Sequence, residues 1–394
     1  MQLAIFIFII LFTVYVLLIG YYWLGWISIP KYQPLNENQH STTKISIIIA
    51  ARNEEQHIKA CLDAILAQSY PKQLFEILVV DDFSSDNTAA IVLQYAAQSV
   101  QLISLKDFIA EGETNAYKKK AIEIAIQQSS GELIVTTDAD CIAPKNWLQH
   151  ISNFYEQKHA AFIAMPVRYH TPKKFIEIFQ SLDFMTLQGI TGAAVYKHLH
   201  NMCNGANLAY TKKAFDEVGG FQGIDHIASG DDMLLMHKIY KQNPQKVFFL
   251  KSDSVIVQTA PMQTLKSFFN QRIRWASKAD KYHDKRIFAV LLLVYLFNVL
   301  LLTLPFVSLC SNAIFSITIY PFTCSMSVLE IWIFIIIGKI IAELFFLFPV
   351  AQFFNDQKLL WWFPLMQPFH IVYTVISGWL GKFGSYKWKD RNVK

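Results

Sequence analysis

The chain is short of the residues that mark several common protein classes. Only 16% of its 394 residues are charged, and its five cysteines are odd in number and form no C-x-x-C pair. This cysteine pattern argues against a disulfide framework and against a structural zinc site, and it fits a reducing cytoplasm. The sequence also contains no G-x-G-x-x-G and no Walker A motif. The common glycine-rich phosphate loops are therefore excluded, so a nucleotide would have to be held by acids and a metal.

Apolar residues are concentrated at the two ends of the chain. Residues 3–27 carry no charge and are long enough to cross a bilayer as a helix. No basic segment precedes them and no cleavage site follows, so they predict a retained anchor. The membrane pattern returns in four later stretches, at 287–309, 310–325, 327–350 and 359–380. They predict either two or four further crossings, because the second stretch is short and the last contains Trp and Pro residues that suit an interfacial or re-entrant segment.

Basic residues flank the C-terminal apolar block and indicate its orientation. They are Lys278, Lys281, Lys285 and Arg286 before the block and Lys382, Lys387, Lys389, Arg391 and Lys394 after it. The positive-inside rule places both clusters in the cytoplasm, so we expect an integral membrane protein whose central domain faces the cytoplasm. The expected location is a bacterial inner membrane. The expected domains are a transmembrane anchor over 1–30, a cytoplasmic domain over 31–286 ending in an interfacial helix at about 262–284, a transmembrane block over 287–381 and a basic cytoplasmic tail over 382–394. The mild net charge of +5 gives no reason to expect a nucleic acid partner.

Strand-like and helix-like segments alternate in the middle of the chain. The segment "KISIIIAARNEEQHIKACLDAIL" begins with an apolar run of strand length and continues with apolar residues at helical spacing. Within it, Asn53 and Gln56 predict a capping box at the start of the helix. The segments "FEILVVDDFSSDNTAAIVLQYAAQ" and "NAYKKKAIEIAIQQSSGELIVTTDADC" repeat the alternation. This pattern predicts an α/β domain with a mostly parallel sheet covered on both faces by helices.

Acidic residues follow two of the predicted strands. Asp138 and Asp140 stand one residue apart after "LIVTT", so an extended strand end would direct both carboxylates to the same side. Ligands of open α/β sheets bind at this C-terminal edge, and two adjacent carboxylates favour a hard divalent cation. An acidic turn is the alternative for so short a motif. Asp81 and Asp82 follow an earlier strand, where a ligand site and a helix-capping turn are both open interpretations.

Two later motifs complete the pattern, "GDD" at 230–232 and "QRIRW" at 271–275. The aspartates could be acids in the first turn of a helix, where the helix dipole favours them. The basic, aromatic "QRIRW" could lie on a membrane surface as an amphipathic helix, and such a helix could also form one wall of a site.

The motifs VDDFSSDNT, TDADC, GDD and QRIRW, in this order and between membrane segments, resemble those of the membrane-bound family 2 glycosyltransferases. That family has the GT-A fold and includes cellulose, chitin, hyaluronan and poly-N-acetylglucosamine synthases. The resemblance covers roughly residues 44–282. It implies an inverting, metal-dependent transfer from a nucleotide-sugar donor, a UDP-hexose or UDP-N-acetylhexosamine, with Mg²⁺ or Mn²⁺ as the cofactor. The acceptor would be a hydroxyl of a membrane-associated lipid or glycan at the cytoplasmic face.

The resemblance also implies a role for each motif residue on the donor side. Asp81 or Asp82 matches the aspartate that contacts the base and ribose of the nucleotide. Lys118 matches the lysine of the family's G-K-x-x-A-L-N helix start, although Tyr117 and Glu123 replace the usual Gly and Asn. This departure leaves the role of the lysine open.

The remaining roles concern the metal, the base and the acceptor. Asp138 and Asp140 match the D-x-D motif for metal and diphosphate, with Asp140 as the direct metal ligand. Asp232 aligns with the catalytic base, and Asp231 replaces the usual glutamate. On the acceptor side the matching residues are Gln271, Arg274, Trp275 and Asn207. One base and no second nucleophilic carboxylate imply a single displacement with inversion.

Two other functions compete with this interpretation. A nucleotidyltransferase would have a basic, glycine-rich loop near the first strand, where this chain has "AARNEEQH". A non-catalytic membrane scaffold or transport subunit that retains a sugar-nucleotide-binding fold is the alternative from another class. Lys339 and Glu343 stand four residues apart in an apolar stretch, and they are either functional intramembrane charges or a pair that neutralises itself.

Overall fold

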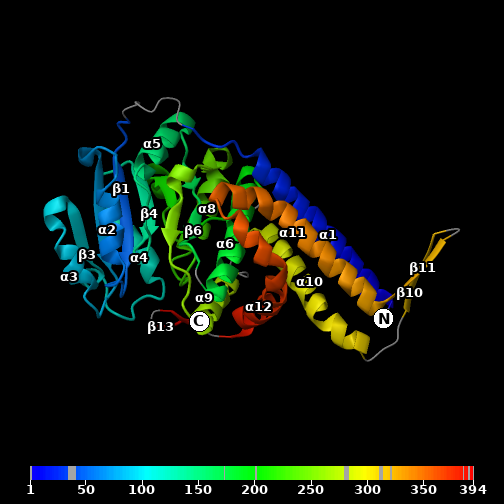
Figure 1. Cartoon of the computed structure of the whole chain (residues 1–394). Coiled ribbons are helices and arrows are strands. Elements are labelled where there is room, and N and C mark those ends of the chain that lie inside the picture. Colours follow the sequence, from blue (N-terminus) through cyan, green and yellow to red (C-terminus); the bar gives the residue numbers. More distant parts are fainter. Residues whose placement is uncertain are drawn as a thin grey trace. The chain divides into compact units, whose positions relative to one another are not determined.

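The computed structural model describes residues 2–33, 41–172, 174–199, 202–278, 284–309, 314–319, 322–384, 386–388 and 391–393. The chain forms two compact units. The sheet unit consists of Ile29–Pro172, Ile190–Pro261 and Lys387–Lys394, and the helical unit of Met1–Ser28, Lys173–Gly189 and Met262–Tyr386. Figure 1 labels many of their helices and strands.

The sheet unit is built on a seven-stranded sheet with the order β3-β2-β1-β4-β7-β5-β8. Its strands are β1 (Ile45–Ala51), β2 (Phe75–Asp81), β3 (Val100–Ser104), β4 (Leu133–Asp138), β5 (Phe162–Ala164), β7 (Leu208–Thr211) and β8 (Val247–Phe249). The pairs β1–β2, β1–β4, β2–β3 and β5–β8 are parallel, whereas β7 runs antiparallel to β4 and β5. The mostly parallel sheet predicted from the sequence is confirmed. A separate parallel pair is formed by β6 (Val167–Tyr169) and β9 (Val257–Thr259).

Helices cover the sheet because its strands are apolar on both faces. In β1, side chains that point in opposite directions, such as Ile47 and Ile48, are almost completely buried. The helices of this unit are α2 (Ile58–Leu66), α3 (Thr88–Leu93), α4 (Tyr117–Gln128), α5 (Trp147–Lys158), α7 (Lys212–Glu217) and α8 (Asp231–Gln242). Its short 3₁₀ helices are η1 (Lys72–Leu74), η2 (Ala96–Gln98), η3 (Leu105–Asp107), η4 (Pro244–Lys246) and η5 (Asp253–Val255).

The predicted capping box of Asn53 and Gln56 is wrong. Helix α2 begins at Ile58, after His57, whose side chain makes no capping hydrogen bond. Asn53 has a left-handed backbone with φ 51°, and its side-chain oxygen accepts a hydrogen bond from the backbone N–H of Ser85 at 2.9 Å. Asn tolerates this conformation better than most residues, and its amide ties the turn after β1 to the turn after β2.

The helical unit consists mainly of long apolar helices. It contains α1 (Gln2–Ser28), α9 (Leu265–Ala276), α10 (Lys285–Leu309), the strands β10 (Ile314–Ile319) and β11 (Phe322–Ser327), α11 (Val328–Phe354), η7 (Gln357–Trp362) and α12 (Phe363–Phe383). Helix α6 (Phe175–Tyr196) contributes its N-terminal part to this unit and its C-terminal part to the sheet unit. Helix α1 runs along α11, and α10 packs against α12. At the C-terminus, β12 (Tyr386–Trp388) pairs with β13 (Arg391–Val393).

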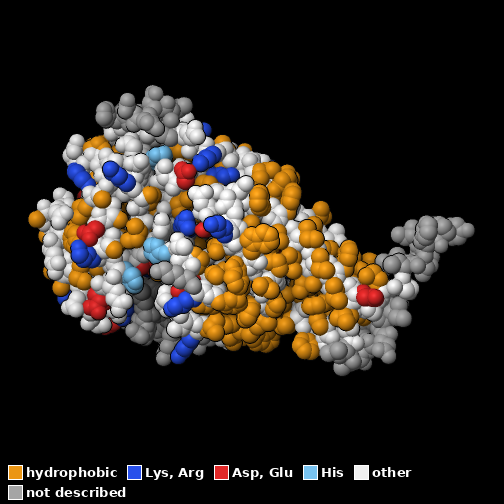
Figure 2. Space-filling view, in the orientation of Figure 1, with side chains coloured by type: hydrophobic (Ala, Val, Ile, Leu, Met, Phe, Trp, Pro, Cys, Tyr) orange, Lys and Arg blue, Asp and Glu red, His pale blue; other side chains and the backbone are white. Residues whose placement is uncertain are grey.

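Four helical stretches within the described residues are long and apolar enough to cross a membrane. They are Leu3–Ser28, Lys285–Ser308, Val328–Phe354 and Gln357–Phe383. Their large apolar side chains are exposed, for example those of Leu17, Phe334 and Phe345. Figure 2 shows such side chains gathered over the helical unit. A surface of this kind is rare on soluble monomers and is typical of a lipid-facing or interacting surface.

Within its described residues, the stretch at 310–325 does not form the helix that the four-crossing alternative requires. The described residues of this region form the antiparallel strands β10 and β11 instead of a helix, whereas 310–313 and 320–321 lie outside the described residues. In "IFSITI" apolar residues alternate with Ser and Thr, which is the period of a strand. The stretch at about 262–284 contains the helix α9, and residues 279–283 lie outside the described range. Its interfacial position stays a prediction.

Lys339 and Glu343 form a closed polar network inside the helical unit. The Lys339 ammonium donates to both carboxylate oxygens of Glu343 at 2.8 Å and to Oε1 of Gln367 on α12 at 2.6 Å. The Gln367 amide donates to Glu343 at 2.9 Å, and the Tyr15 hydroxyl of α1 donates to the same carboxylate. The three donors of the ammonium are therefore used, and the contacts favour a pair that neutralises itself while it joins α1, α11 and α12.

We expect Lys339→Met to destabilise the helical unit by about 3–5 kcal/mol, because it leaves the buried Glu343 carboxylate uncompensated. The double variant Lys339→Met/Glu343→Met should recover most of this loss, since a buried ion pair can be replaced by apolar side chains at little cost. Thermal unfolding in detergent would measure both effects. A double variant as unstable as Lys339→Met would contradict the neutralising interpretation.

Candidate functional site

The acidic motifs of the sheet unit lie at the C-terminal edge of neighbouring parallel strands. Asp81 ends β2 and pairs in register with Ala51 of β1, and Asp138 ends β4 and pairs with Ala50 of the same strand. Strand β1 therefore separates the two acidic segments by the width of one strand. This is the edge at which open α/β sheets bind ligands, as the sequence predicted.

Lys118 joins the D-x-D segment to the "GDD" segment. It lies in the first turn of α4, and its ammonium is 2.6 Å from Oδ1 of Asp138 and 3.4 Å from Oδ2 of Asp231. Burial lowers the pKa of Lys118, but the negative charges of Asp138, Asp231 and Asp232 outweigh it, so the pKa is raised well above its usual value. Lys118 is therefore a permanent positive charge between the two acidic motifs at physiological pH.

Asp232 is held in a fixed orientation by two backbone N–H groups. Its Oδ2 accepts from Gly205 at 3.0 Å, and its Oδ1 accepts from Met233 at 2.7 Å in the first turn of α8. A Cβ atom at Gly205 would lie 3.3 Å from both the Lys118 ammonium and Oδ2 of Asp231. The missing side chain thus lets the "CNGAN" segment approach the charged cluster closely.

Asp140 lies near Asp138 and is held by β9. Its Oδ2 accepts a hydrogen bond from the Thr259 hydroxyl at 3.1 Å. Within the described part of the chain, no three His, Cys, Asp or Glu side chains come together as a complete metal site. Magnesium is commonly held by one or two carboxylates together with substrate phosphates and water, and the oxygen donors of Asp138 and Asp140 fit that chemistry.

The two thiols near the D-x-D segment do not suit a metal. Cys61 Sγ lies 3.7 Å from the backbone oxygen of Asp138, and Cys141 Sγ lies 3.6 Å from Oδ1 of Asp140. Burial, with the nearby carboxylates, raises the pKa of both thiols. Thiols are soft ligands, whereas Mg²⁺ and Mn²⁺ prefer oxygen ligands such as carboxylates.

Asp81 and Asp82 are both buried, but they differ in their contacts. Within the described residues, Oδ1 of Asp81 is a buried oxygen with no hydrogen-bond partner. Asp82 belongs to a turn held by Arg52, whose guanidinium donates to the backbone oxygens of Asp82 at 2.9 Å and of Phe83 at 3.1 Å. A buried carboxylate oxygen without a partner is costly, and such atoms often belong to functional sites.

Asn207 is part of the core, and its contacts argue against the predicted role on the acceptor side. The side chain is 0% exposed. Its oxygen accepts from the Trp147 indole at 2.9 Å, and its amide donates to the backbone oxygens of Pro166 and Val255 at 2.8 Å each. Asn207 therefore joins three segments of the sheet unit, and its polar atoms do not face an acceptor.

We expect Asn207→Ala to destabilise the sheet unit by about 3 kcal/mol or more, because it leaves three buried polar groups without partners. The loss should appear as a lower melting temperature in differential scanning calorimetry. Glu132→Ala, at an exposed position of the same unit, is a control with little expected effect. An unchanged melting temperature together with weaker acceptor binding would contradict the structural role.

The "QRIRW" residues form a second group, in the helical unit. Gln271, Arg274 and Trp275 lie on α9, and the Trp275 ring is 6.3 Å from the Phe184 ring of α6. Gln271 accepts a hydrogen bond from Arg272, the second residue of the motif, at 2.7 Å. Sequence reasoning did not single out Arg272, although its guanidinium is buried and paired with Asp183. The sequence offers one signal for the role of Arg272, namely that an arginine stands inside the predicted amphipathic helix.

Comparisons with known proteins agree with the motif pattern. Residues 133–355 match the family model Glycosyl transferase family group 2, and residues 46–219 match Glycosyl transferase family 2. The chain is 28% identical over 257 residues to the probable glycosyltransferase YdaM of Bacillus subtilis, which covers 63% of this chain and 57% of that protein. It is 28% identical over 191 residues to glycosyltransferase AglE of Haloferax volcanii, which covers 48% of this chain and 59% of that protein. The chain thus spans less than two thirds of the length of these relatives.

A solved structure shares the fold along almost the whole chain. It is the mannosyltransferase PcManGT of Pyrobaculum calidifontis in complex with GDP-Man and Mn²⁺. The TM-score is 0.57 and the identity 17%, and the likeness covers 96% of this chain and 98% of that one. At this identity the likeness shows the fold alone.

Proposed function

The chain belongs to Glycosyl transferase family group 2, whose model covers more than half of it, and we propose that it is an inverting, metal-dependent glycosyltransferase. The donor is a nucleotide sugar, for which we favour a UDP-hexose or UDP-N-acetylhexosamine. The acceptor is a hydroxyl of a membrane-associated lipid or glycan. The observation that carries the proposal is the position of Lys118 between Asp138 and Asp231, because it joins the metal motif and the base motif in one site.

On the donor side, Asp81 is the better candidate for binding the nucleotide. Its buried oxygen has no partner in the described residues, whereas Asp82 lies in the turn held by Arg52. A ribose hydroxyl or a base N–H would satisfy that oxygen. Lys118 is positioned to attract the diphosphate, and the donor would then compete with Asp138 and Asp231 for the ammonium.

Asp140, with Asp138, is the proposed ligand pair for Mg²⁺ or Mn²⁺. PcManGT, which shares the fold, was solved with Mn²⁺ and a nucleotide sugar, and this supports the same cofactor class here. A divalent ion at these carboxylates would supply Lewis-acid stabilisation of the leaving diphosphate. The Thr259 hydroxyl holds one oxygen of Asp140 and so orients the carboxylate.

Asp232 is the proposed general base. Its carboxylate is fixed by the N–H groups of Gly205 and Met233, so it can accept a proton from an acceptor hydroxyl without reorientation. Attack by that hydroxyl forms the new C–O bond at the anomeric carbon while the bond to the diphosphate breaks. A single displacement of this kind inverts the anomeric configuration.

The acceptor wall is proposed to consist of Gln271, Arg274 and Trp275. An indole ring is a suitable platform for a sugar ring, and the planar guanidinium of Arg274 suits a phosphate. Asn207 is not included, because its side chain is buried and fully engaged in the core.

The proposed topology places the sheet unit at the cytoplasmic face, where the basic clusters lie by the positive-inside rule. Helix α1 is the anchor, and α10 and α11 cross the bilayer. Both are clearly more apolar than the Gln357–Phe383 stretch. That stretch has the exposed Trp361 and Trp362 near its start and contains Pro368, so it is assigned to the interface. Two C-terminal crossings then return the basic tail to the cytoplasm.

The test is nucleoside diphosphate release by the full chain in nanodiscs that contain bacterial lipid extract. A panel of UDP-sugars and GDP-sugars would be assayed with Mn²⁺ and with EDTA. Release that requires one sugar and the metal is the expected result. If no sugar nucleotide binds by isothermal titration calorimetry and none is consumed, the scaffold alternative replaces the enzyme.

A further inference from the structure

Arg272, the second residue of the "QRIRW" segment, is buried and paired with an acidic residue. It is 4% exposed, and its partner Asp183 on α6 is 7% exposed. The guanidinium donates to Oδ2 of Asp183 from Nε at 3.0 Å and from Nη2 at 2.6 Å. The hydroxyl of Tyr373 on α12 donates to the other oxygen of the same carboxylate. One buried charge pair therefore joins α6, α9 and α12.

The same guanidinium also contacts two residues of the acceptor-side motif. Its Nη1 donates to Oε1 of Gln271 at 2.7 Å. Its carbon Cζ lies 4.3 Å from the centre of the Trp275 ring and 4.7 Å from the centre of the Phe268 ring. The guanidinium thus bonds one motif residue and contacts the aromatic ring of another. An ammonium group could not make this combination of planar stacking and forked hydrogen bonds.

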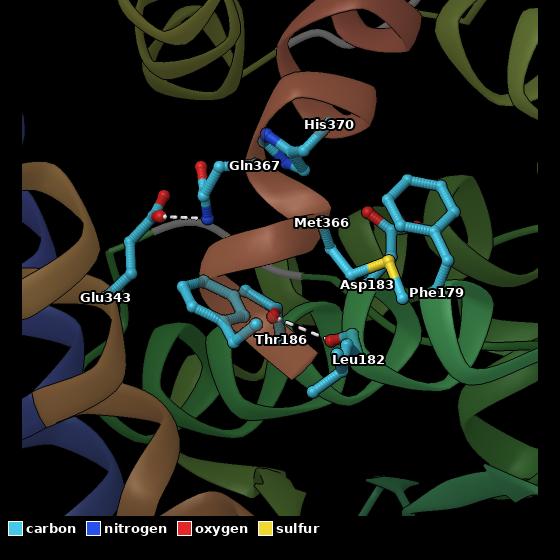
Figure 3. Close-up of a pocket in the computed structure, with 9 residues that line it drawn as sticks. Phe179, Leu182, Asp183, Thr186, Glu343, Met366, Gln367 and His370 are labelled. Atoms are coloured by element: carbon cyan, nitrogen blue, oxygen red, sulfur yellow. Dashed lines mark hydrogen bonds between the residues drawn. The ribbon is translucent and has the colours of Figure 1, made fainter. Parts of the chain in front are cut away.

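Packing around Asp183 is incomplete on one side. A cavity of about 30 Å³ is lined by side chains of α6, α11 and α12, and Figure 3 shows Asp183 beside Met366, His370 and Phe179 at this cavity. Side chains that border a cavity lack close neighbours on that side, so packing there does not fix the rotamer of the Asp183 carboxylate. The hydrogen bonds of Arg272 and Tyr373 therefore determine how Asp183 is oriented.

We propose that Asp183, Arg272 and Tyr373 are positioning residues that fix Gln271 and Trp275 of the acceptor wall. The inference rests on the proposed function for the role of that wall, but the contacts themselves do not depend on it. None of the three needs to touch the substrate. Asp183 and Tyr373 hold the guanidinium, and the guanidinium holds the Gln271 amide and the Trp275 ring. Loss of Asp183 should therefore displace Trp275, although the two side chains lie on different helices.

The first test measures the position of Trp275 without any substrate. The full chain has nine tryptophans, so 5-fluorotryptophan labelling gives a ¹⁹F NMR spectrum in which Trp275→Phe identifies one line. We expect Asp183→Asn and Arg272→Lys to displace the Trp275 line by more than its width. Lys59→Met, in an exposed ion pair of α2, should leave that line in place. An unmoved Trp275 line in both Asp183→Asn and Arg272→Lys would overturn the proposal.

The other tryptophan lines of the ¹⁹F spectrum show whether a variant has lost its fold. If Asp183→Asn broadens every line, Tyr373→Phe, which removes a single hydroxyl group, takes its place. A displaced Trp275 line in Tyr373→Phe supports the proposal, and an unmoved line overturns it.

The second test separates acceptor positioning from donor binding. In the nanodisc assay with Mn²⁺ and lipid extract, Asp183→Asn and Arg272→Lys should lower nucleoside diphosphate release by about 10- to 100-fold. This is the size of loss that a displacement of a positioning group by about 1 Å causes. The Kd of UDP should stay within about twofold of wild type, and Lys59→Met should match wild type in both. Equal losses in UDP binding and in release would contradict a positioning role. Silence of the wild type towards every sugar nucleotide would refute the proposed function, while the ¹⁹F spectrum would still decide on the positioning residues.

Discussion

Asp232→Asn is expected to lower sugar transfer by about 10²- to 10⁴-fold, the usual contribution of a general base. The amide keeps the shape of the carboxylate and one hydrogen-bond acceptor, but it cannot take the proton of the acceptor hydroxyl. It also cannot accept from both Gly205 and Met233, so a stability loss of about 1 kcal/mol is expected beside the catalytic loss. Initial rates of nucleoside diphosphate release would measure the first effect, and thermal unfolding the second.

The donor should still bind to Asp232→Asn with a nearly unchanged Kd, because the proposed base does not hold the nucleotide. Asp225→Asn is a matched control, since Asp225 is an exposed aspartate of the same unit. A rate for Asp232→Asn within about threefold of wild type, with the same donor Kd, would exclude the base role. The anomeric configuration of the wild-type product, read by NMR, independently tests the single displacement.

Asp140→Ala is expected to abolish the metal dependence of transfer and to lower the rate by about 10²- to 10³-fold. This range corresponds to the several kcal/mol that a Lewis acid contributes to a transition state with developing charge. In wild type, EDTA should cause a loss of the same size, and in Asp140→Ala it should cause no further loss. Titration with Mn²⁺ in the presence of UDP, followed by electron paramagnetic resonance, would count the bound ions.

Thr259→Val tests the role of Asp140 with a smaller expected loss of rate than Asp140→Ala. It keeps the shape of the side chain but removes the hydroxyl that donates to Asp140 at 3.1 Å. Loss of one such hydrogen bond corresponds to about a 3- to 10-fold lower rate. If EDTA has no effect on wild-type transfer, the D-x-D aspartates do not act through a metal, and both predictions are wrong.

Local sequence predicted the sheet and its acidic edge well, because both depend on short-range patterns. The apolar runs of β1, β2 and β4 and the helical spacing of α2 identify their elements, and the ends of parallel strands share one edge. The GT-A fold and the family expected from the motif order are confirmed by the matched family models and the shared fold. The roles of the individual site residues remain proposals.

Contacts between distant segments account for what the sequence did not predict. Asn207 bonds Trp147, which is 60 residues away, so the side chain's burial has no local signal. Asp183 and Arg272 are 89 residues apart, and nothing in either segment identifies the other. The paired strands at 314–319 and 322–327 fall in a stretch for which a crossing was one of two open interpretations, because a short apolar run fits both a strand and a helix.

The hydrogen bond between Tyr15 and Glu343 also has a consequence for the biogenesis of the protein. The two residues are 328 positions apart, which a ribosome covers in roughly 15–65 s at about 5–20 residues per second. In the proposed topology, α1 enters the bilayer first and waits that long for its polar partner. Lys339 and Glu343 emerge only four residues apart, so α11 can be inserted with its charges already paired. Membrane integration would thus finish late, when α11 arrives and Tyr15 gains an acceptor.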